Sequence, residues 1–216
     1  MNLTTIAVDG PAGSGKSTVA KLIAKRQSIT YLDTGAMYRA VTLKVIESKI
    51  SLDDDCGIKE MLKTTEIDFI DGNLFLDGVD VSEAIRMPEI NQKVSSIASK
   101  FDVREKLVTL QQNIASNKSI IMDGRDIGTK VLPNATYKFF LIASIEERAK
   151  RRFDELTNKG IAVELADIIK EIEDRDYADT HRENSPLVQA EDAILIDTTT
   201  DSIDDVVTKI IAAMEY

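Results

Sequence analysis

The chain has 216 residues, 43% hydrophobic and 30% charged, which suits one globular domain with a small insertion. Its formal net charge of −10 argues against a nucleic-acid binder and against a protein of anionic membranes, because both need a broad basic face. The single cysteine, Cys56, cannot form an internal disulfide. Neither a secretory signal nor an apolar run of membrane-spanning length is present, so we expect a cytoplasmic protein.

The segment from Asp9 to Thr18 follows a short apolar strand pattern and precedes an amphipathic helical pattern. Two glycines with four residues between them are followed by Lys16 and Ser17, which is the phosphate-loop pattern in its strand–loop–helix setting. In such a loop the backbone N–H groups bind phosphate, the lysine reaches the β- and γ-phosphates, and the hydroxyl ligates Mg²⁺. We therefore expect nucleotide binding rather than a merely glycine-rich turn. The residues of the expected site are Gly10, Pro11, Ala12, Gly13, Ser14, Gly15, Lys16, Ser17 and Thr18.

A short apolar strand pattern at residues 29–32 leads into a helical pattern that runs to about Lys49. Thr34 is expected to cap this helix, and Arg39 lies about one turn inside it. Two interpretations stay open. The segment is either a capped helix with a surface arginine or a second anion-binding helix start that faces the phosphate loop.

Residues 66–81 alternate in hydrophobicity around the turns Asp71-Gly72 and Asp77-Gly78, which is typical of a small antiparallel meander. A polar loop at 51–57 and a short helical piece at 58–63 precede it. Such a unit within a chain of alternating strands and helices indicates an insertion.

Helical patterns return from Ser82 to about Asn117, and Pro88 marks one helix start. Arg86 and Arg104 lie in this stretch. A lone arginine is more often a solvated surface residue than a ligand, so both are candidates only.

A β-rich apolar run at residues 119–123 ends in Asp123. This is the pattern of the second acidic strand of phosphate-loop proteins, whose carboxylate helps to hold the magnesium shell, here through water. Arg125 and Asp126 follow in a tight loop at the carboxyl end of that strand, where open α/β sheets place ligands. A structural salt bridge is the alternative for that pair.

The remaining patterns predict strands at 136–142 and 193–197 and helices at 145–159, 163–182 and 202–214, the last capped by Asp201 or Ser202. Five of the ten arginines fall within residues 148–182. Arginine binds phosphate bidentately, so in an acidic chain this concentration favours a clamp over phosphates, with a solvated helix face as the alternative. These arginines are Arg148, Arg151, Arg152, Arg175 and Arg182.

Strands that alternate with helices predict an α/β fold, a doubly wound parallel sheet with helices on both faces. The small antiparallel insertion and a short helical lid complete this prediction.

The residue inventory limits the chemistry. With one histidine, His181, and one cysteine, His-based metal centres and most Ser-His or Cys-His catalysis are nearly excluded. Phosphoryl transfer needs neither residue, because an acceptor phosphate with a second pKa of about 6 is already largely anionic and requires no general base. Alignment and charge neutralisation by Lys16, Mg²⁺ and arginines would then suffice.

Six motifs together span nearly the whole chain: Gly10–Thr18, Asp33–Arg39, Ile85–Glu89, Val103–Glu105, Asp123–Asp126, and Arg175-Asp176 with Asp179, Arg182 and Ser185–Leu187. In this combination the chain resembles the bacterial cytidylate kinases. The resemblance implies ATP- and Mg²⁺-dependent phosphorylation of CMP or dCMP. We expect the protein to be a monomer, and its acidic charge predicts no nucleic-acid or membrane partner.

The resemblance also implies roles for individual residues. Thr34, Arg39, Arg125 and Arg182 would hold the acceptor phosphate. Ser95, Arg104 and Asp126 would read the cytosine edge, and Arg175 with Asp179 would hold the sugar. The lid arginines Arg148, Arg151 and Arg152 would lie over the ATP phosphates. Lys16, Arg39, Arg125 and Arg182 would form the catalytic set.

The domain division follows from the same resemblance. A core domain is expected at residues 1–57 and 98–216, including an arginine-rich lid at about 148–182. An inserted nucleoside-monophosphate-binding domain is expected at about 58–97.

The sequence argues against three other functions. A GTP-dependent switch should carry an Asn-Lys-x-Asp element, but the Asn-Lys pairs at 117–118 and 158–159 both lack the final aspartate. A kinase for AMP, UMP or a metabolite hydroxyl would need a different acceptor pocket. A nucleotide-sensing module would have little use for acceptor-side arginines.

Overall fold

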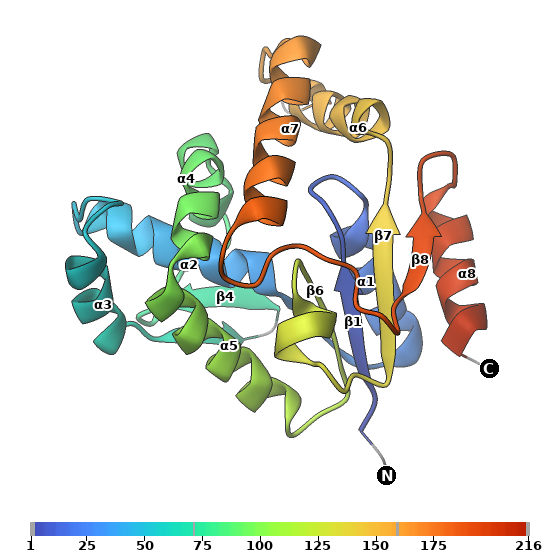
Figure 1. Cartoon of the computed structure of the whole chain (residues 1–216), viewed down its shortest axis with the longest axis horizontal. Coiled ribbons are helices and arrows are strands. Elements are labelled where there is room, and N and C mark those ends of the chain that lie inside the picture. Colours follow the sequence, from blue (N-terminus) through green and yellow to red (C-terminus); the bar gives the residue numbers. More distant parts are fainter. Residues whose placement is uncertain (1–2, 71, 159, 215–216) are drawn as a thin grey trace. The chain divides into compact units, whose positions relative to one another are not determined.

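The computed structural model describes residues 3–70, 72–158 and 160–214 (Figure 1). The chain forms two compact units, one made of Met1–Leu32 with Asn117–Tyr216 and the other of Asp33–Ser116. We call them the phosphate-loop unit and the inserted unit. In the described residues, no helix has the length and apolar character needed to cross a membrane.

A five-stranded sheet organises the phosphate-loop unit, in the order β2-β6-β1-β7-β8. The central strand β1 pairs in parallel with β6 and with β7, and β7 pairs in parallel with β8. Ile6 and Ile121 in the middle strands are fully buried, as the continuous apolar runs of parallel strands require. The strands are β1 (Thr5–Asp9), β2 (Thr30–Asp33), β6 (Ile120–Gly124), β7 (Tyr137–Ile142) and β8 (Ile194–Asp197).

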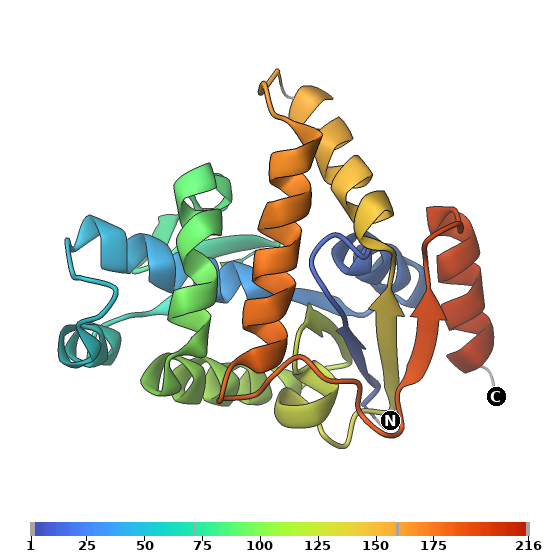
Figure 2. The same ribbon diagram turned by 45° about the horizontal axis from the view of Figure 1, so that its top comes forward.

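Two helices of this unit, α1 (Lys16–Gln27) and α8 (Ile203–Met214), pack on the sheet and share one apolar core with it. Two others, α6 (Ile145–Asn158) and α7 (Leu165–His181), run side by side and have a separate small core (Figure 2). The predicted α/β class with a parallel sheet is confirmed.

The inserted unit contains the predicted meander as a three-stranded antiparallel sheet, β3-β4-β5. The second turn has the expected chemistry, since Asp77 and Gly78 both take positive φ, 50° and 82°. Asp71 of the first predicted turn lies outside the described residues. The elements of this unit are α2 (Thr34–Glu47), α3 (Asp55–Lys63), β3 (Ile67–Ile70), β4 (Asn73–Leu76), β5 (Val79–Asp80), a 3₁₀ turn (Ala84–Arg86), α4 (Pro88–Ser99) and α5 (Phe101–Ala115).

The caps of two helices differ from the prediction. Asp33, not Thr34, caps α2, because its carboxylate accepts a hydrogen bond from Ala36 N at 2.9 Å. Helix α3 begins three residues earlier than expected, since Asp54 caps it by accepting from Gly57 N at 2.8 Å. The prediction that Thr34 caps α2 was therefore wrong, and the Thr34 hydroxyl is not needed for capping.

The closing helix follows one of the two predicted alternatives. Ser202 Oγ accepts from Asp205 N at 3.2 Å, and the Asp205 carboxylate accepts in return from Ser202 N at 3.2 Å. Asp201 instead forms an ion pair with Lys209.

The inserted unit is wider than the range 58–97 expected for an inserted domain, because helices α2 and α5 pack with α4 in the same unit. The narrower range stays a prediction for the segment specific to the acceptor.

Candidate active site

The phosphate loop depends on its glycines at two points. Gly10 has φ of 143°, and a Cβ built on it would stand 2.0 Å from the carbonyl oxygen of Leu141 in β7. Gly15 caps α1 in the left-handed conformation, with φ of 86°. Both conformations favour glycine, so the loop can pass close to the sheet and then turn into the helix.

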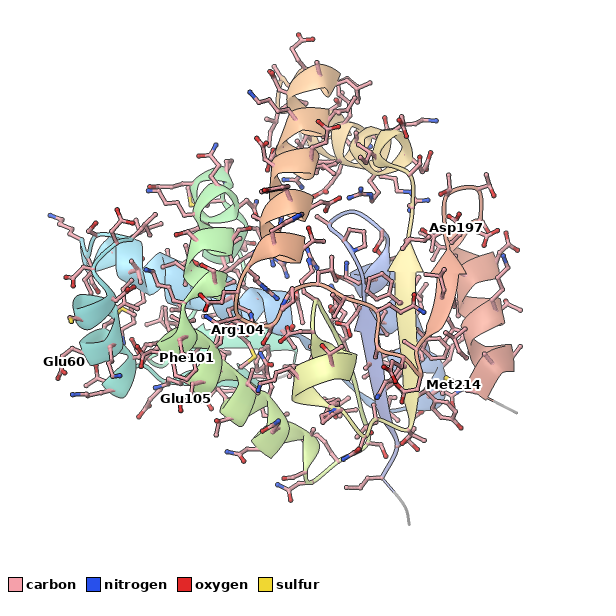
Figure 3. All side chains as sticks on the ribbon, in the orientation of Figure 1. Glu60, Phe101, Arg104, Glu105, Asp197 and Met214 are labelled. Carbon is pink, nitrogen blue, oxygen red and sulfur yellow. The ribbon has the colours of Figure 1, made fainter. Side chains whose placement is uncertain are left out.

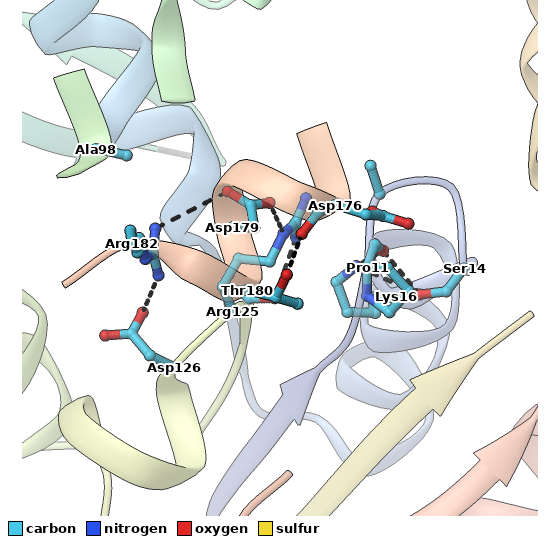
Figure 4. Close-up of polar contacts among 12 residues, drawn as sticks. Pro11, Ser14, Lys16, Ala98, Arg125, Asp126, Asp176, Asp179, Thr180 and Arg182 are labelled. Carbon is cyan, nitrogen blue, oxygen red and sulfur yellow. Dashed lines mark hydrogen bonds and ion pairs between the residues drawn. The ribbon is translucent and has the colours of Figure 1, made fainter. Parts of the chain in front are cut away.

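Lys16 lies inside this loop rather than pointing into solvent. Its Nζ donates to Pro11 O at 2.6 Å and to Ser14 Oγ at 3.3 Å (Figure 4), and the residue is only 5% exposed. Burial, together with the positive charge of Arg125, lowers the pKa of Lys16 well below its usual range, against the opposite effect of Asp123. Negative charge in the loop would act in the same direction as Asp123, because an opposite charge favours the protonated amine.

Asp123, at the end of β6, is held on both oxygens. Ser17 Oγ donates to Oδ2 at 2.6 Å and the Tyr31 hydroxyl donates to Oδ1 at 2.7 Å. Tyr31 was not predicted as a site residue, because a tyrosine in a half-buried strand carries no signal beyond packing. The residues described here contain no group of three or more His, Cys, Asp or Glu side chains that could hold a metal.

Asp9 joins the end of β1 to the loop that follows β6. Its carboxylate accepts from Ile127 N at 2.8 Å and from Gly128 N at 2.7 Å. Burial raises the pKa of Asp9 to about 6, although the two N–H groups lower it. Asp9 lies inside the motif quoted for the phosphate loop, but its spacing gave no sign of this second contact.

Four charged residues form an alternating chain at the base of α7 (Figure 4). Arg125 Nε contacts Asp179 at 2.8 Å, Asp179 lies 4.0 Å from Arg182, and Arg182 lies 3.8 Å from Asp126. The side chains are 5–17% exposed. Arg125 and Asp126, neighbours in the chain, pair with Asp179 on α7 and with Arg182 directly after α7. These ion pairs agree with the salt-bridge alternative, and the binding of a ligand by either residue stays a prediction.

The opposite charges of these ion-paired residues stabilise one another. Burial alone would raise the pKa of Asp179, but Arg125 and Arg175 outweigh it and lower the pKa below the ordinary range. Burial would lower the pKa of Arg125, and Asp179 instead raises it. The carboxylate and the guanidinium are thus both ionised, and the positive groups are fixed in position before any anion arrives.

The three predicted lid arginines have different surroundings. Arg148 is 3% exposed and donates to the carbonyl oxygens of Ala12 and Ala143, each at 3.0 Å. Arg151 donates to Thr198 O at 2.6 Å, and its Nη1 lies 3.9 Å from where a Cβ on Gly15 would stand. Arg152 pairs with Glu155 at 2.8 Å. Their contact with ATP phosphates stays a prediction.

Thr198 is a further residue of this site that was not predicted from the sequence. Its buried hydroxyl donates to Ser14 O and to Ile142 O, both at 3.1 Å. The hydroxyl thereby fixes the phosphate loop against the ends of β7 and β8.

In the inserted unit, the predicted acceptor residues lie on α2, α4 and α5. Arg39 Nε donates to Asn91 on α4 at 3.2 Å, and Arg86 forms an ion pair with Asp33 at 2.7 Å. Burial would raise the pKa of Asp33, but Arg39 and Arg86 lower it overall. Thr34, at the start of α2, is buried, and Ser95 on α4 is half-buried.

Arg104 on α5 (Figure 3) is 4% exposed. Its Nη1 donates to Ala98 O at 3.0 Å, and its guanidinium carbon lies 5.3 Å from the ring centroid of Tyr38. The aromatic face and the carbonyl hold the fork in one orientation. Arg104 is therefore not the solvated surface arginine that a lone arginine usually is.

Comparison with known proteins gives the family. The family model described as cytidylate kinase matches residues 6–216. The chain belongs to the cytidylate kinase family. It is 54% identical over 215 residues to a cytidylate kinase of Caldanaerobacter subterraneus subsp. tengcongensis, covering 99% of this chain and 96% of that one. It is 53% identical over 211 residues to a cytidylate kinase of Alkaliphilus oremlandii, covering 98% and 97%.

Solved structures agree on the fold alone. A gluconokinase from Sinorhizobium meliloti 1021 has a TM-score of 0.50 at 15% identity, covering 98% of this chain and 91% of that one. An uncharacterized protein from Eubacterium ventriosum has a TM-score of 0.54 at 14% identity, covering 99% of both chains.

Proposed function

We propose that this chain transfers the γ-phosphate of ATP to the 5′-phosphate of CMP or dCMP, giving CDP or dCDP and ADP, with Mg²⁺. Membership of the cytidylate kinase family supports the reaction. The single structural observation that supports it most is the alternating chain of Arg125, Asp179, Arg182 and Asp126 in the unit that carries the phosphate loop. A protein that only bound a nucleotide would not need these acceptor-side cations.

On the donor side, the loop N–H groups and Lys16 bind the ATP phosphates. The amine of Lys16, now on Pro11 O and Ser14 Oγ, exchanges these partners for phosphate oxygens. Arg148, Arg151 and Arg152 complete the donor set in this proposal. The loop then supplies fixed positive charge where negative charge develops during transfer.

The magnesium ion fits the donor set of Ser17 and Asp123. Mg²⁺ keeps several waters and takes few protein ligands beside substrate phosphates, so one hydroxyl and one carboxylate are enough. Ser17 would ligate the ion and Asp123 would hold one of its waters, with Tyr31 fixing that carboxylate. A magnesium ion held there would supply charge neutralisation at the phosphates.

On the acceptor side, no general base is required because the phosphate of CMP is already largely anionic. In the phosphate-loop unit, Arg125 and Arg182 would bind that phosphate, Arg175 and Asp179 the sugar, and Asp126 the cytosine amine. In the inserted unit, Thr34 and Arg39 would hold the same phosphate. Ser95 and Arg104 would read the cytosine edge. We also propose that the enzyme acts as a cytoplasmic monomer, and its charge of −10 supports the absence of nucleic-acid or anionic-membrane partners.

The proposal is tested by measuring ADP release with ATP, Mg²⁺ and CMP, dCMP, UMP or AMP in turn. We expect CMP and dCMP to give kcat/KM values at least about 100-fold above that of AMP, because a site with polar groups for one base leaves them unpaired with another. Equal turnover of AMP and CMP would contradict the cytosine assignment. Absence of turnover with all four would favour a nucleotide-sensing protein.

A further inference from the structure

The helices α6 and α7 form a pair with its own apolar core. Ala149 on α6 packs with Ile168 and Ile172 on α7, apart from the core that the sheet shares with α1 and α8. Two polar contacts attach this helix pair to the rest of the unit. Arg148 on α6 donates to Ala12 O, and Asp179 on α7 pairs with Arg125. Attachments of this polar kind permit relative motion, so the residues that make them decide how the pair moves.

Arg148 is the attachment to the phosphate loop. Its Nη1 donates to Ala12 O at 3.0 Å, and a Cβ built on Gly13 would stand 3.1 Å from the Cβ of Arg148. The third group of its fork, Nη2, contacts Asp176 Oδ2 on α7 at 2.7 Å. One buried guanidinium therefore joins the donor loop directly to α7.

The environment of Asp176 is unfavourable for one of its two carboxylate oxygens. Its other oxygen, Oδ1, is buried and has no hydrogen-bond partner, which is unfavourable for a carboxylate. Its charge also acts on Arg125, whose pKa it raises together with Asp179. Asp176 thus lies between one arginine that contacts the donor loop and another in the proposed acceptor set.

Asp176 lies close along α7 to two residues of the proposed acceptor site. Arg175 precedes it and Asp179 lies three residues further on, about one helical turn. Both are acceptor-side residues in the proposed function. A contact that fixes α7 relative to the phosphate loop therefore also fixes these residues.

We propose that Asp176 is a positioning residue that, through Arg148, couples the donor loop to the acceptor residues of α7. This inference rests on the proposed function. When the loop is ordered by a bound nucleotide, Arg148 and Asp176 hold α7 in the arrangement that binds the nucleoside monophosphate. By linkage, each substrate then raises the affinity for the other by the same factor.

The coupling is measured by calorimetric titration of CMP into the enzyme, with and without saturating Mg²⁺ and the non-hydrolysable ATP analogue adenylyl imidodiphosphate. In the unaltered chain we expect CMP to bind at least about fivefold tighter when the analogue is present. Asp176→Asn, which keeps the shape and removes the charge, should reduce this factor to below about twofold. The reverse titration, analogue into the enzyme with and without CMP, must give the same factors.

Asp174→Asn is the matched control, because it removes the same charge from an exposed position on the same helix. It should keep the full coupling. Asp176→Glu should restore part of it, and Arg148→Lys, which keeps the charge but not the fork, should lose it. These two variants decide the matter if Asp176→Asn fails to fold.

The outcomes separate the two proposals. If the unaltered chain phosphorylates CMP but shows no coupling, or if Asp176→Asn retains it, the role of Asp176 is refuted and the proposed function stands. If the unaltered chain neither binds nor phosphorylates CMP, both are refuted.

Discussion

Gly10→Ala tests the geometry on which the donor site depends. The added Cβ would stand 2.0 Å from Leu141 O, whereas ordinary contact begins at 3.4 Å, so β7 or the loop would have to move. The substituted residue would also be held at φ of 143°, which costs about 1–3 kcal/mol for a residue with a side chain. Disturbing a buried backbone group of β7 adds about 1–3 kcal/mol. We expect a total loss of about 4 kcal/mol in the free energy of unfolding.

Gly78→Ala is the matched control for this substitution. Gly78 also has a positive φ, 82°, but a Cβ on it would meet nothing within 4 Å. It should therefore cost only the backbone strain, about 1–2 kcal/mol. The measurement is urea denaturation of the three proteins, with the KM for ATP alongside. Equal losses for the two variants, or a normal KM for ATP in Gly10→Ala, would refute the close packing of the loop on β7.

Three further outcomes are expected. Lys16→Ala should lower kcat at least about 100-fold with the fold intact, whereas Lys25→Ala, on an exposed turn of the same helix, should not; circular dichroism checks the fold. Tyr31→Phe should weaken Mn²⁺ binding to the ATP complex about tenfold by electron paramagnetic resonance, because Asp123 loses a donor. Asp9 has a folded pKa of about 6, above its ordinary 3.8, so the folded state binds more protons in this interval and the free energy of unfolding should fall by about 2 kcal/mol from pH 4 to 6. Asp9→Asn should flatten that part of the curve.

The parts of the fold that follow from local pattern could be predicted from the sequence. The phosphate loop, the parallel strands and the meander depend on glycine positions and on periodicity, which a single sequence displays. Caps were harder, because Asp33 and Thr34 are both good capping residues and only the backbone angle decides between them.

Contacts between distant segments could not be predicted in this way. The hydroxyl of Tyr31 meets Asp123 across 92 positions, and Thr198 meets Ser14 across 184. Each follows from strand order, which brings strand ends together without leaving a mark on local sequence. The protein partners of Arg148 and its burial could not be foreseen for the same reason, because they depend on segments that are distant in the sequence.

The fate of the γ-phosphate tests the central claim most directly. The enzyme is incubated with ATP labelled with ³²P at the γ-position, Mg²⁺ and CMP, and the labelled products are separated by chromatography. Transfer from the phosphate loop to an acceptor phosphate predicts that the label appears in CDP, with little in inorganic phosphate while CMP is present. Label released only as inorganic phosphate, at a rate that CMP does not change, would contradict the account.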